Sequence, residues 1–331
     1  MPSRKRAGRS FSRRFILFAL FIILAILAYT GVWFYAADTL ERRTITAIEN
    51  LNVGHQRANC EEPTARGYPF RIGLFCRSVF YEDAKNGISI SAGAFRSAAQ
   101  VYQPMRTVGE LDGPARIATP YLPAIEAAWE NMRVSARLTT SLPERISSEA
   151  RNVVLTLDDE SRQPIARAES FQAHTRQNGS DLDIAVIAQA LTIDPEFTNG
   201  SAMPALAGEL LLTVDDGVSL ARLNAPGLRG RSGTIENLSL KIAGGEAGLI
   251  LKGPVRVAEN GLLDAELRVT VSEPQRIAQL VGTILPEKRD EIAGITAGLA
   301  NLGTAPTLPV NIRQGRVFVG FLPLGSIPPV Q

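Results

Sequence analysis

The chain has 331 residues, of which 35 are basic and 33 acidic, with two cysteines and two histidines. Six basic residues lie within the first fourteen positions, so the rest of the chain carries 29 basic and 33 acidic side chains, a net charge of −4. Such a chain lacks the basic footprint of nucleic-acid binding, and we expect no nucleic-acid partner.

An uncharged apolar run, Phe15 to Tyr35, follows this basic start. About 20 apolar residues in helical form cross the ~30 Å core of a bilayer, so the run predicts one membrane-spanning helix. The positive-inside rule then places the N-terminus in the cytoplasm and the bulk of the chain in the periplasm, as a single-pass inner-membrane protein. Trp33, Phe34 and Tyr35 are expected at the far membrane interface. A cleaved signal peptide is the alternative, although no small-x-small site follows the run.

The predicted division of the chain has four parts. A basic cytoplasmic tail covers 1–14, the anchor 15–35, a helical stalk 36–59 and a periplasmic β-rich domain 60–331. Thr39 to Asn50 carries a thin apolar stripe that continues the anchor helix, and Gly54 is a candidate for its end.

Cys60 and Cys76 both lie beyond the anchor, in a compartment that is oxidising if it is a periplasm. An even count favours a disulfide between them, worth about 3 kcal/mol for a loop of about 16 residues in the chain-entropy model. No C-x-x-C indicates a redox site, and zinc would need two further ligands besides these cysteines.

Short runs of alternating apolar and polar residues, separated by turns of the x-Gly type, fill most of the remaining chain. Leu263 to Val271 is the cleanest of them. Two runs flank a turn at Asn178 to Asp181, and in the second the apolar phase shifts near Ala188 to Ala190, which indicates a β-bulge. The pattern predicts a mainly β fold with some α: an elongated, curved antiparallel meander.

The period then changes to that of helices. Ser272 to Leu285 begins with a capping-box pattern, Ser272 and Gln275, and Pro286 to Leu302 predicts a second C-terminal helix. A last hairpin turns at Gln314-Gly315, and the final residues are too rich in proline for the interior of a sheet. The helices are expected to pack five side chains on the sheet: Ile277, Leu280, Ile284, Ile292 and Leu299.

A search for catalytic signatures finds no phosphate-binding loop, dinucleotide fingerprint, zinc-protease motif or nucleophile elbow. We therefore expect no enzyme activity, no catalytic or metal-ligating residue and no cofactor. His55 near Cys60 would be a weak metal or catalytic pair, and His174 reads as an exposed side chain beside a turn. The acidic groups Asp158 to Glu160 and Asp215 to Gly217 lack the spacing of a calcium loop and are interpreted as turns.

The apolar faces of three neighbouring runs form the candidate functional surface. Strand alternation places their apolar side chains on one side, with Lys241, Lys252 and Arg268 on the other. If the helices cover this surface, it is a closed core; if not, it is an open groove that fits acyl chains. The candidate groove residues are Leu238, Leu240, Leu249, Leu251, Leu263, Leu267 and Val269.

Three sequence blocks carry a family resemblance. They are the anchor end G-V-W-F-Y-A-A, the block GYPFRIGLFC at 67–76 and the block GRVFVGFLPLG at 315–325. With them, nearly the whole chain resembles the bacterial family named domain of unknown function 2125, which implies an envelope protein held in the inner membrane. An anchored meander that begins at a G-Y-P-F strand is more loosely similar to the AsmA-like envelope proteins, whose grooves are associated with lipid transport.

The sequence therefore predicts an anchored, non-enzymatic envelope protein that binds the membrane and binds or passes lipid along an apolar β-groove. Two alternatives stay open. The first is a structural or assembly factor with a closed core, which would act through another envelope protein. The second is an envelope hydrolase whose carboxylates meet in space without a recognisable motif.

Overall fold

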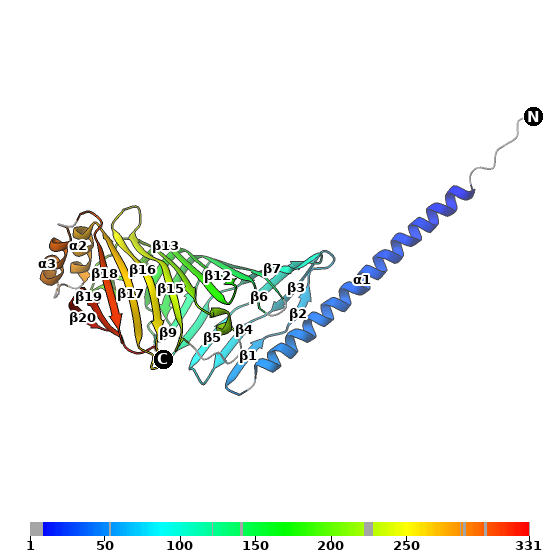
Figure 1. The fold of residues 1–331 in the computed structure, drawn as a ribbon. Helices are drawn as coiled ribbons and strands as arrows, with labels where there is room; N and C mark the ends of the chain where they lie inside the picture. The colour runs from blue at the N-terminus through cyan, green and yellow to red at the C-terminus, as the bar shows by residue number, and fades with distance from the viewer. Residues whose placement is uncertain are drawn as a thin grey trace, which may run out of the picture.

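The computed structural model describes residues 9–52, 54–120, 122–139, 142–221, 228–284, 286, 289–300 and 303–330. A long helix leads into one open antiparallel sheet, and two short helices lie near the far end of that sheet (Figure 1). This arrangement confirms the predicted mainly β meander with an N-terminal apolar helix and short C-terminal helices.

The long helix, α1, runs from Arg9 to Leu51 without a break. It contains the apolar run and is the one described helix that is long and apolar enough to cross a membrane. It ends earlier than the predicted stalk at 36–59, because the chain turns at Gly54 with φ +71° and enters the sheet at Gln56. Of the predicted tail at 1–14, residues 1–8 lie outside the described part of the chain.

Strand pairing follows chain order once the first ten strands are taken in consecutive pairs. Each pair is one long strand that breaks in the middle, so that its two halves bond to the two halves of the next long strand. The halves are β1 Gln56–Cys60 and β2 Thr64–Arg66, β3 Arg71–Cys76 and β4 Val79–Asp83, β5 Ile88–Ala92 and β6 Phe95–Gln100, β7 Gln103–Leu111 and β8 Ala115–Thr119, and β9 Leu122–Ala128 and β10 Asn131–Arg137.

The later strands are continuous and continue the same meander, each paired with the one before it. The 3₁₀ turns η1 Pro195–Thr198 and η2 Gly217–Ala221 lie in the connections on either side of β14. The strands are β11 Arg145–Leu157, β12 Pro164–Asn178, β13 Asp181–Ile193, β14 Leu206–Val214, β15 Ser232–Ile242, β16 Gly248–Val257, β17 Leu263–Ser272, β18 Thr307–Arg313, β19 Arg316–Val319 and β20 Leu322–Ser326.

The breaks in the first five long strands line up across the sheet and form a corner. Gly93 lies at one break, where an added Cβ would stand 3.0 Å from the carbonyl oxygen of Asp112 on the next strand. Trp129 lies at another and donates from its indole nitrogen to the carbonyl of Leu111 at 2.8 Å. Bends of this kind let one sheet curve back on itself without losing its strand order.

An ion pair ties the corner together. Both guanidinium nitrogens of Arg96 bond the carboxylate of Asp112, one of them at 2.8 Å. The hydrogen bond from Arg96 lowers the pKa of Asp112 below its ordinary value. The pair therefore stabilises the corner above the ordinary pKa of an aspartate and weakens as the pH falls through the lowered one. Because both groups are about half exposed, its contribution is below about 1 kcal/mol.

The predicted hairpins agree with the register of the strands. The turn between β12 and β13 joins Asn178 to Asp181, and the register against β14 shifts between Ala188 and Leu191, which confirms the bulge. Ala190, with φ +50°, is the residue that makes the shift. The last hairpin turns at Gln314 and Gly315 as predicted. The proline-rich tail adds one further strand, β20, at the edge of the sheet.

Two short helices, α2 Pro274–Ile284 and α3 Arg289–Ala300, connect β17 to β18. The predicted capping box is wrong, because Ser272 is still in the sheet and pairs with Gly248. Glu273, with φ +50°, turns the chain, and Pro274 takes the first helical position, where a missing N–H costs nothing. The second helix starts at Arg289, three residues after the predicted Pro286.

The disulfide between Cys60 and Cys76 is present. It joins the end of β1 to the end of β3 at the corner, so it crosslinks the first two long strands where both bend. The paired cysteines are 8% and 5% exposed, and the structure describes no free cysteine.

Replacing both cysteines by serine should lower the free energy of unfolding by up to about 3 kcal/mol, since the crosslink closes a loop of 16 residues. Urea unfolding of the full chain in detergent measures the loss, and peptide mapping without reductant verifies the link in the parent protein. An unchanged unfolding midpoint in the double variant would show that the corner holds without it.

Candidate functional site

The seven predicted groove residues share one face of the sheet. Leu238 stands opposite Leu251, and Leu251 opposite Val269, while Leu240 stands opposite Leu249. Leu263 and Leu267 follow at alternate positions along β17. Direct neighbours in antiparallel strands point to the same side, so the register places all seven together. Lys252 and Arg268 also stand opposite each other, on the other side.

This surface is open in one part and closed in another. Leu238, Leu240 and Leu249 are 39%, 42% and 38% exposed, values far from those of a packed interior. Leu267 is only 7% exposed, because it packs in a cluster with Ala265 and Ile312. The predicted set is therefore not one uniform groove: its β15–β16 part faces outward and its β17 part belongs to a small core.

Helix α2 covers one end of this side of the sheet. Ile277 and Leu280 pack against a buried cluster of Leu206, Ile242 and Ala247, as expected. Ile284, the third residue expected to pack from the first helix, is not part of this cluster. The helix therefore covers the end of that side of the sheet and leaves its middle uncovered. The contacts expected for Ile292 and Leu299 fall on side chains outside the described part of the structure.

The side of the sheet that carries the predicted residues continues well beyond them. One row of direct register partners crosses the sheet from β17 toward the anchor, and each member stands opposite the next. Single runs of alternating residues indicate these faces, but only the register joins them into one surface. The row consists of Val269, Leu251, Leu238, Leu210, Val186, Ala173, Ser148, Val134 and Gly109.

No described layer of the protein buries this face as the second sheet of a sandwich would. The structure has two small clusters of buried apolar residues, and no large side chain in the described part of the chain is less than 2% exposed. A sheet with one apolar face normally buries it against another element. We name the open surface formed by Val186, Leu210, Leu238, Leu240 and Leu249 the apolar face.

At the other end of the sheet, α1 covers the edge strand. Glu41 accepts a hydrogen bond from the backbone nitrogen of Ala65 in β2 at 2.6 Å, and the Asn52 side chain bonds both backbone groups of Ala58 in β1. These side chains take the place of a neighbouring strand. The helix thus protects an edge that would otherwise be free to pair with another chain.

Trp33 fixes the helix to the sheet. It is 6% exposed, donates to the carbonyl oxygen of Arg71 at 2.9 Å and packs edge-on against Tyr68. Of the three residues of the predicted aromatic belt, Trp33 therefore faces the sheet, and its side chain is not exposed to lipid. Phe34 and Tyr35 are 59% and 73% exposed and remain available to lipid.

A depression of about 580 Å³ lies on the opposite, charged face, near β6, β7, β10 and β11. Glu110 stands there between Arg96 and Arg133, at 3.8 and 3.9 Å. Alternating charges neutralise one another, so the depression offers no concentrated charge to an ionic ligand. His174 also lines it, half-buried and 3.3 Å from the side-chain oxygen of Gln172.

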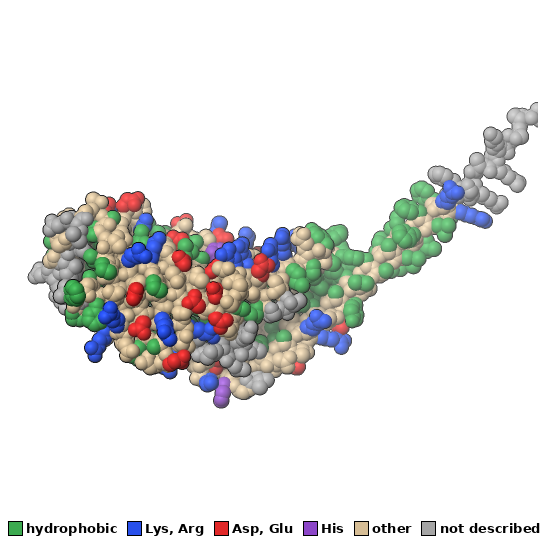
Figure 2. Space-filling model, viewed as in Figure 1, with side chains coloured by type: hydrophobic (Ala, Val, Ile, Leu, Met, Phe, Trp, Pro, Cys, Tyr) green, Lys and Arg blue, Asp and Glu red, His purple; other side chains and the backbone are tan. Residues whose placement is uncertain are grey.

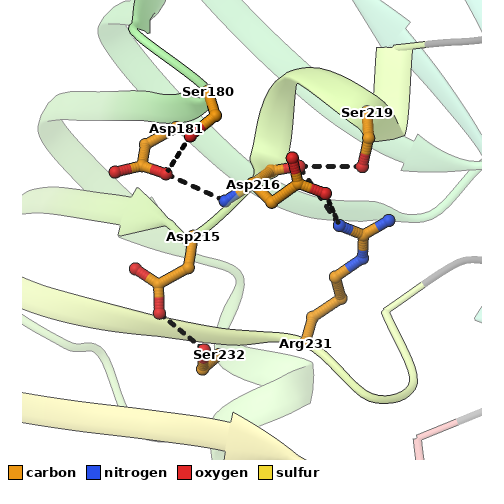
Figure 3. A network of polar contacts seen from close by, with 7 residues as sticks. All are labelled: Ser180, Asp181, Asp215, Asp216, Ser219, Arg231 and Ser232. Atoms are coloured by element: carbon orange, nitrogen blue, oxygen red, sulfur yellow. Dashed lines mark hydrogen bonds and ion pairs between the residues drawn. The ribbon is translucent and has the colours of Figure 1, made fainter.

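The acidic turns hold the fold and do not converge on a metal site. Ser232 donates to Asp215 at 2.5 Å, Arg231 pairs with Asp216 at 3.0 Å, and Asp181 accepts from the backbone nitrogen of Asp216 at 2.9 Å (Figure 3). Within the described ranges, no group of three or more histidine, cysteine, aspartate or glutamate side chains could hold an ion.

The second acidic turn has the same local role. Asp159 accepts from the backbone nitrogen and the hydroxyl of Ser161, and this hydroxyl contact lowers the pKa of Asp159. Cys60 has no free thiol, because it forms the disulfide with Cys76. It therefore cannot act together with the exposed His55 in a catalytic or metal-binding pair.

Comparison with known families settles the relationship. The family model DUF2125, described as an uncharacterized protein conserved in bacteria, matches residues 33–328. The chain belongs to this family. The match begins at Trp33, the residue that docks α1 on the sheet, and includes the whole apolar face. No curated protein matches the chain.

Aspartate substitutions at Leu249 and Leu267 should separate the open and closed parts of this side of the sheet. A carboxylate at Leu267 would be buried without a partner and should cost about 3 kcal/mol or more. At Leu249, which is 38% exposed, the cost should stay near or below about 1 kcal/mol.

Urea unfolding of the two full-length variants, followed by circular dichroism, makes the comparison. The two positions serve as controls for each other, since they carry the same substitution on the same side of the sheet. Equal and large losses at both positions would mean that the apolar face is covered in solution.

Proposed function

We propose that this protein is a membrane-anchored, non-enzymatic envelope protein whose apolar face holds the acyl chains of lipids. The observation that carries the proposal is the exposure of Leu238, Leu240 and Leu249, 39%, 42% and 38%, on one face of a sheet. An exposed contiguous apolar surface on a folded protein is typical of an interaction site. Because about 40% of each leucine is still exposed, burying the remainder would contribute roughly 1 kcal/mol per residue.

Lipid is favoured over a protein partner by position. The row of register partners that includes Leu238, Leu210 and Val186 of the apolar face runs across the sheet toward the strands that dock on α1, the helix that enters the membrane. Acyl chains therefore have a short path from the bilayer to the sheet. Acyl chains also need no hydrogen-bonding groups, and the face supplies almost none.

The proposed location is the inner membrane of a bacterium, with the N-terminus in the cytoplasm and the sheet in the periplasm. Its support is the excess of basic residues before the apolar run and the disulfide, which persists in an oxidising compartment. The looser similarity to AsmA-like proteins agrees with this proposal as an analogy of architecture only.

A structural or assembly factor is the second candidate. In that case another envelope protein would cover the apolar face, and lipid would be absent from it. A hydrolase has less support, because the described carboxylates discussed above are engaged in turns and ion pairs. Turnover of an envelope substrate that is abolished by one acidic substitution would favour the hydrolase.

Lipid bound by the full chain tests the proposal. We expect the detergent-purified protein to retain lipid, detected by mass spectrometry after extraction, and a double substitution on the apolar face, Leu240→Glu with Leu249→Glu, to reduce the lipid per chain several-fold. Charged side chains within this face would oppose the burial of acyl chains.

The matched control is Lys241→Glu with Ile250→Glu, which changes the neighbouring residues on the other side of the same two strands. It keeps the anchor, and hence the lipid around the anchor, unchanged. Equal lipid content in the two double variants would contradict lipid binding on the apolar face.

A further inference from the structure

The end of the sheet nearest the anchor carries exposed apolar side chains on two adjacent turns. The β2–β3 turn and the β6–β7 turn lie side by side, joined by a 3.1 Å hydrogen bond from the backbone nitrogen of Val101 to the carbonyl of Phe70. In Figure 2 hydrophobic side chains gather over this end of the sheet, next to the apolar helix. We name as the sheet tip Tyr68, Phe70, Val101, Tyr102 and Met105, which are 46%, 74%, 38%, 73% and 52% exposed.

The sheet tip is held against the membrane-spanning part of α1. The hydroxyl of Tyr29 donates to the carbonyl of Pro69, and the hydroxyls of Thr30 and Tyr68 share a 2.8 Å hydrogen bond. Phe34 also stacks on Tyr68, with 5.9 Å between ring centres. These contacts fix the height of the tip along the helix axis.

That height lies within the bilayer. The apolar run ends at Tyr35, and Tyr29 lies six residues before it, or roughly 9 Å along a helix. Ending the span before Tyr29 would leave only Phe15 to Ala28, roughly 21 Å of helix, too short for a ~30 Å hydrocarbon core. The β2–β3 turn therefore lies beside helix residues that the membrane must contain.

Charge supports the same placement. Arg71 follows Phe70 directly and Arg106 follows Met105, so two of the five tip residues are followed by an exposed arginine. Arg106 also stands opposite Arg137 in the sheet, and neither Arg71 nor Arg106 forms an ion pair with a described residue. Apolar side chains ahead of basic ones are typical of a surface that enters lipid and meets its phosphates.

We propose that the sheet tip is inserted in the membrane leaflet on the side of the sheet, with Arg71 and Arg106 at the level of the lipid phosphates. The protein then has two membrane contacts, α1 and the tip, which together fix the tilt of the sheet on the bilayer. This contact holds whether or not the apolar face carries lipid, because it rests on the docking of the tip against α1.

Single cysteines at Tyr102 and at Lys85 test the insertion. Lys85 is an exposed residue of the β4–β5 turn, at the opposite ends of these long strands, and the structure describes no free cysteine that would compete for the label. Each full-length variant, labelled with an environment-sensitive fluorophore, is placed in nanodiscs of phosphatidylcholine and phosphatidylglycerol that carry a spin label on the acyl chain.

The label at position 102 should emit at shorter wavelength and be quenched several-fold more than the label at position 85. Phe70→Cys provides a second tip position, so that one poorly folded variant does not decide the result, and peptide mapping of the disulfide verifies the fold of each variant. Equal quenching at positions 102, 70 and 85 would overturn the proposal.

Discussion

A sheet with one apolar face and no second layer over most of it is the constraint on which the rest of this structure depends. Burial of apolar side chains is the main source of folding free energy, yet Leu238, Leu240 and Leu249 remain more than a third exposed. The fold compensates locally, with a small core at each end of the face, a disulfide at the corner and a helix along the edge strand. The exposed apolar face is therefore the surface that a ligand or a partner protein can bury.

The corner gives the sheet its particular form. Five long strands break along one line. There Gly93 allows the backbone carbonyl of Asp112 to approach closely, and Arg96 bonds the side-chain carboxylate of Asp112. Beyond this line the halves β2, β3, β6 and β7 lead to the sheet tip beside α1. The anchor and the sheet thus form one connected structure, joined at Trp33.

Much of this architecture could be predicted from residue patterns. Strict alternation in β17 and the phase shift at Ala190 are local signals, and both correspond to features of the sheet. The capping box at Ser272 failed, because the pairing of Ser272 with Gly248 kept it in the sheet against its local preference. The burial of Leu267 beside the exposure of Leu249 could not be predicted, since it depends on which distant strands pack against each residue.

Contact between lipid and the apolar face is the central claim, and site-specific photocrosslinking in growing cells tests it most directly. A photoreactive amino acid at Leu240 should yield a phospholipid adduct on the full chain, while the same amino acid at Lys241, the next residue on the other side of β15, should yield little or none. A protein adduct at Leu240 in place of lipid, or equal lipid adducts at both positions, would contradict the account.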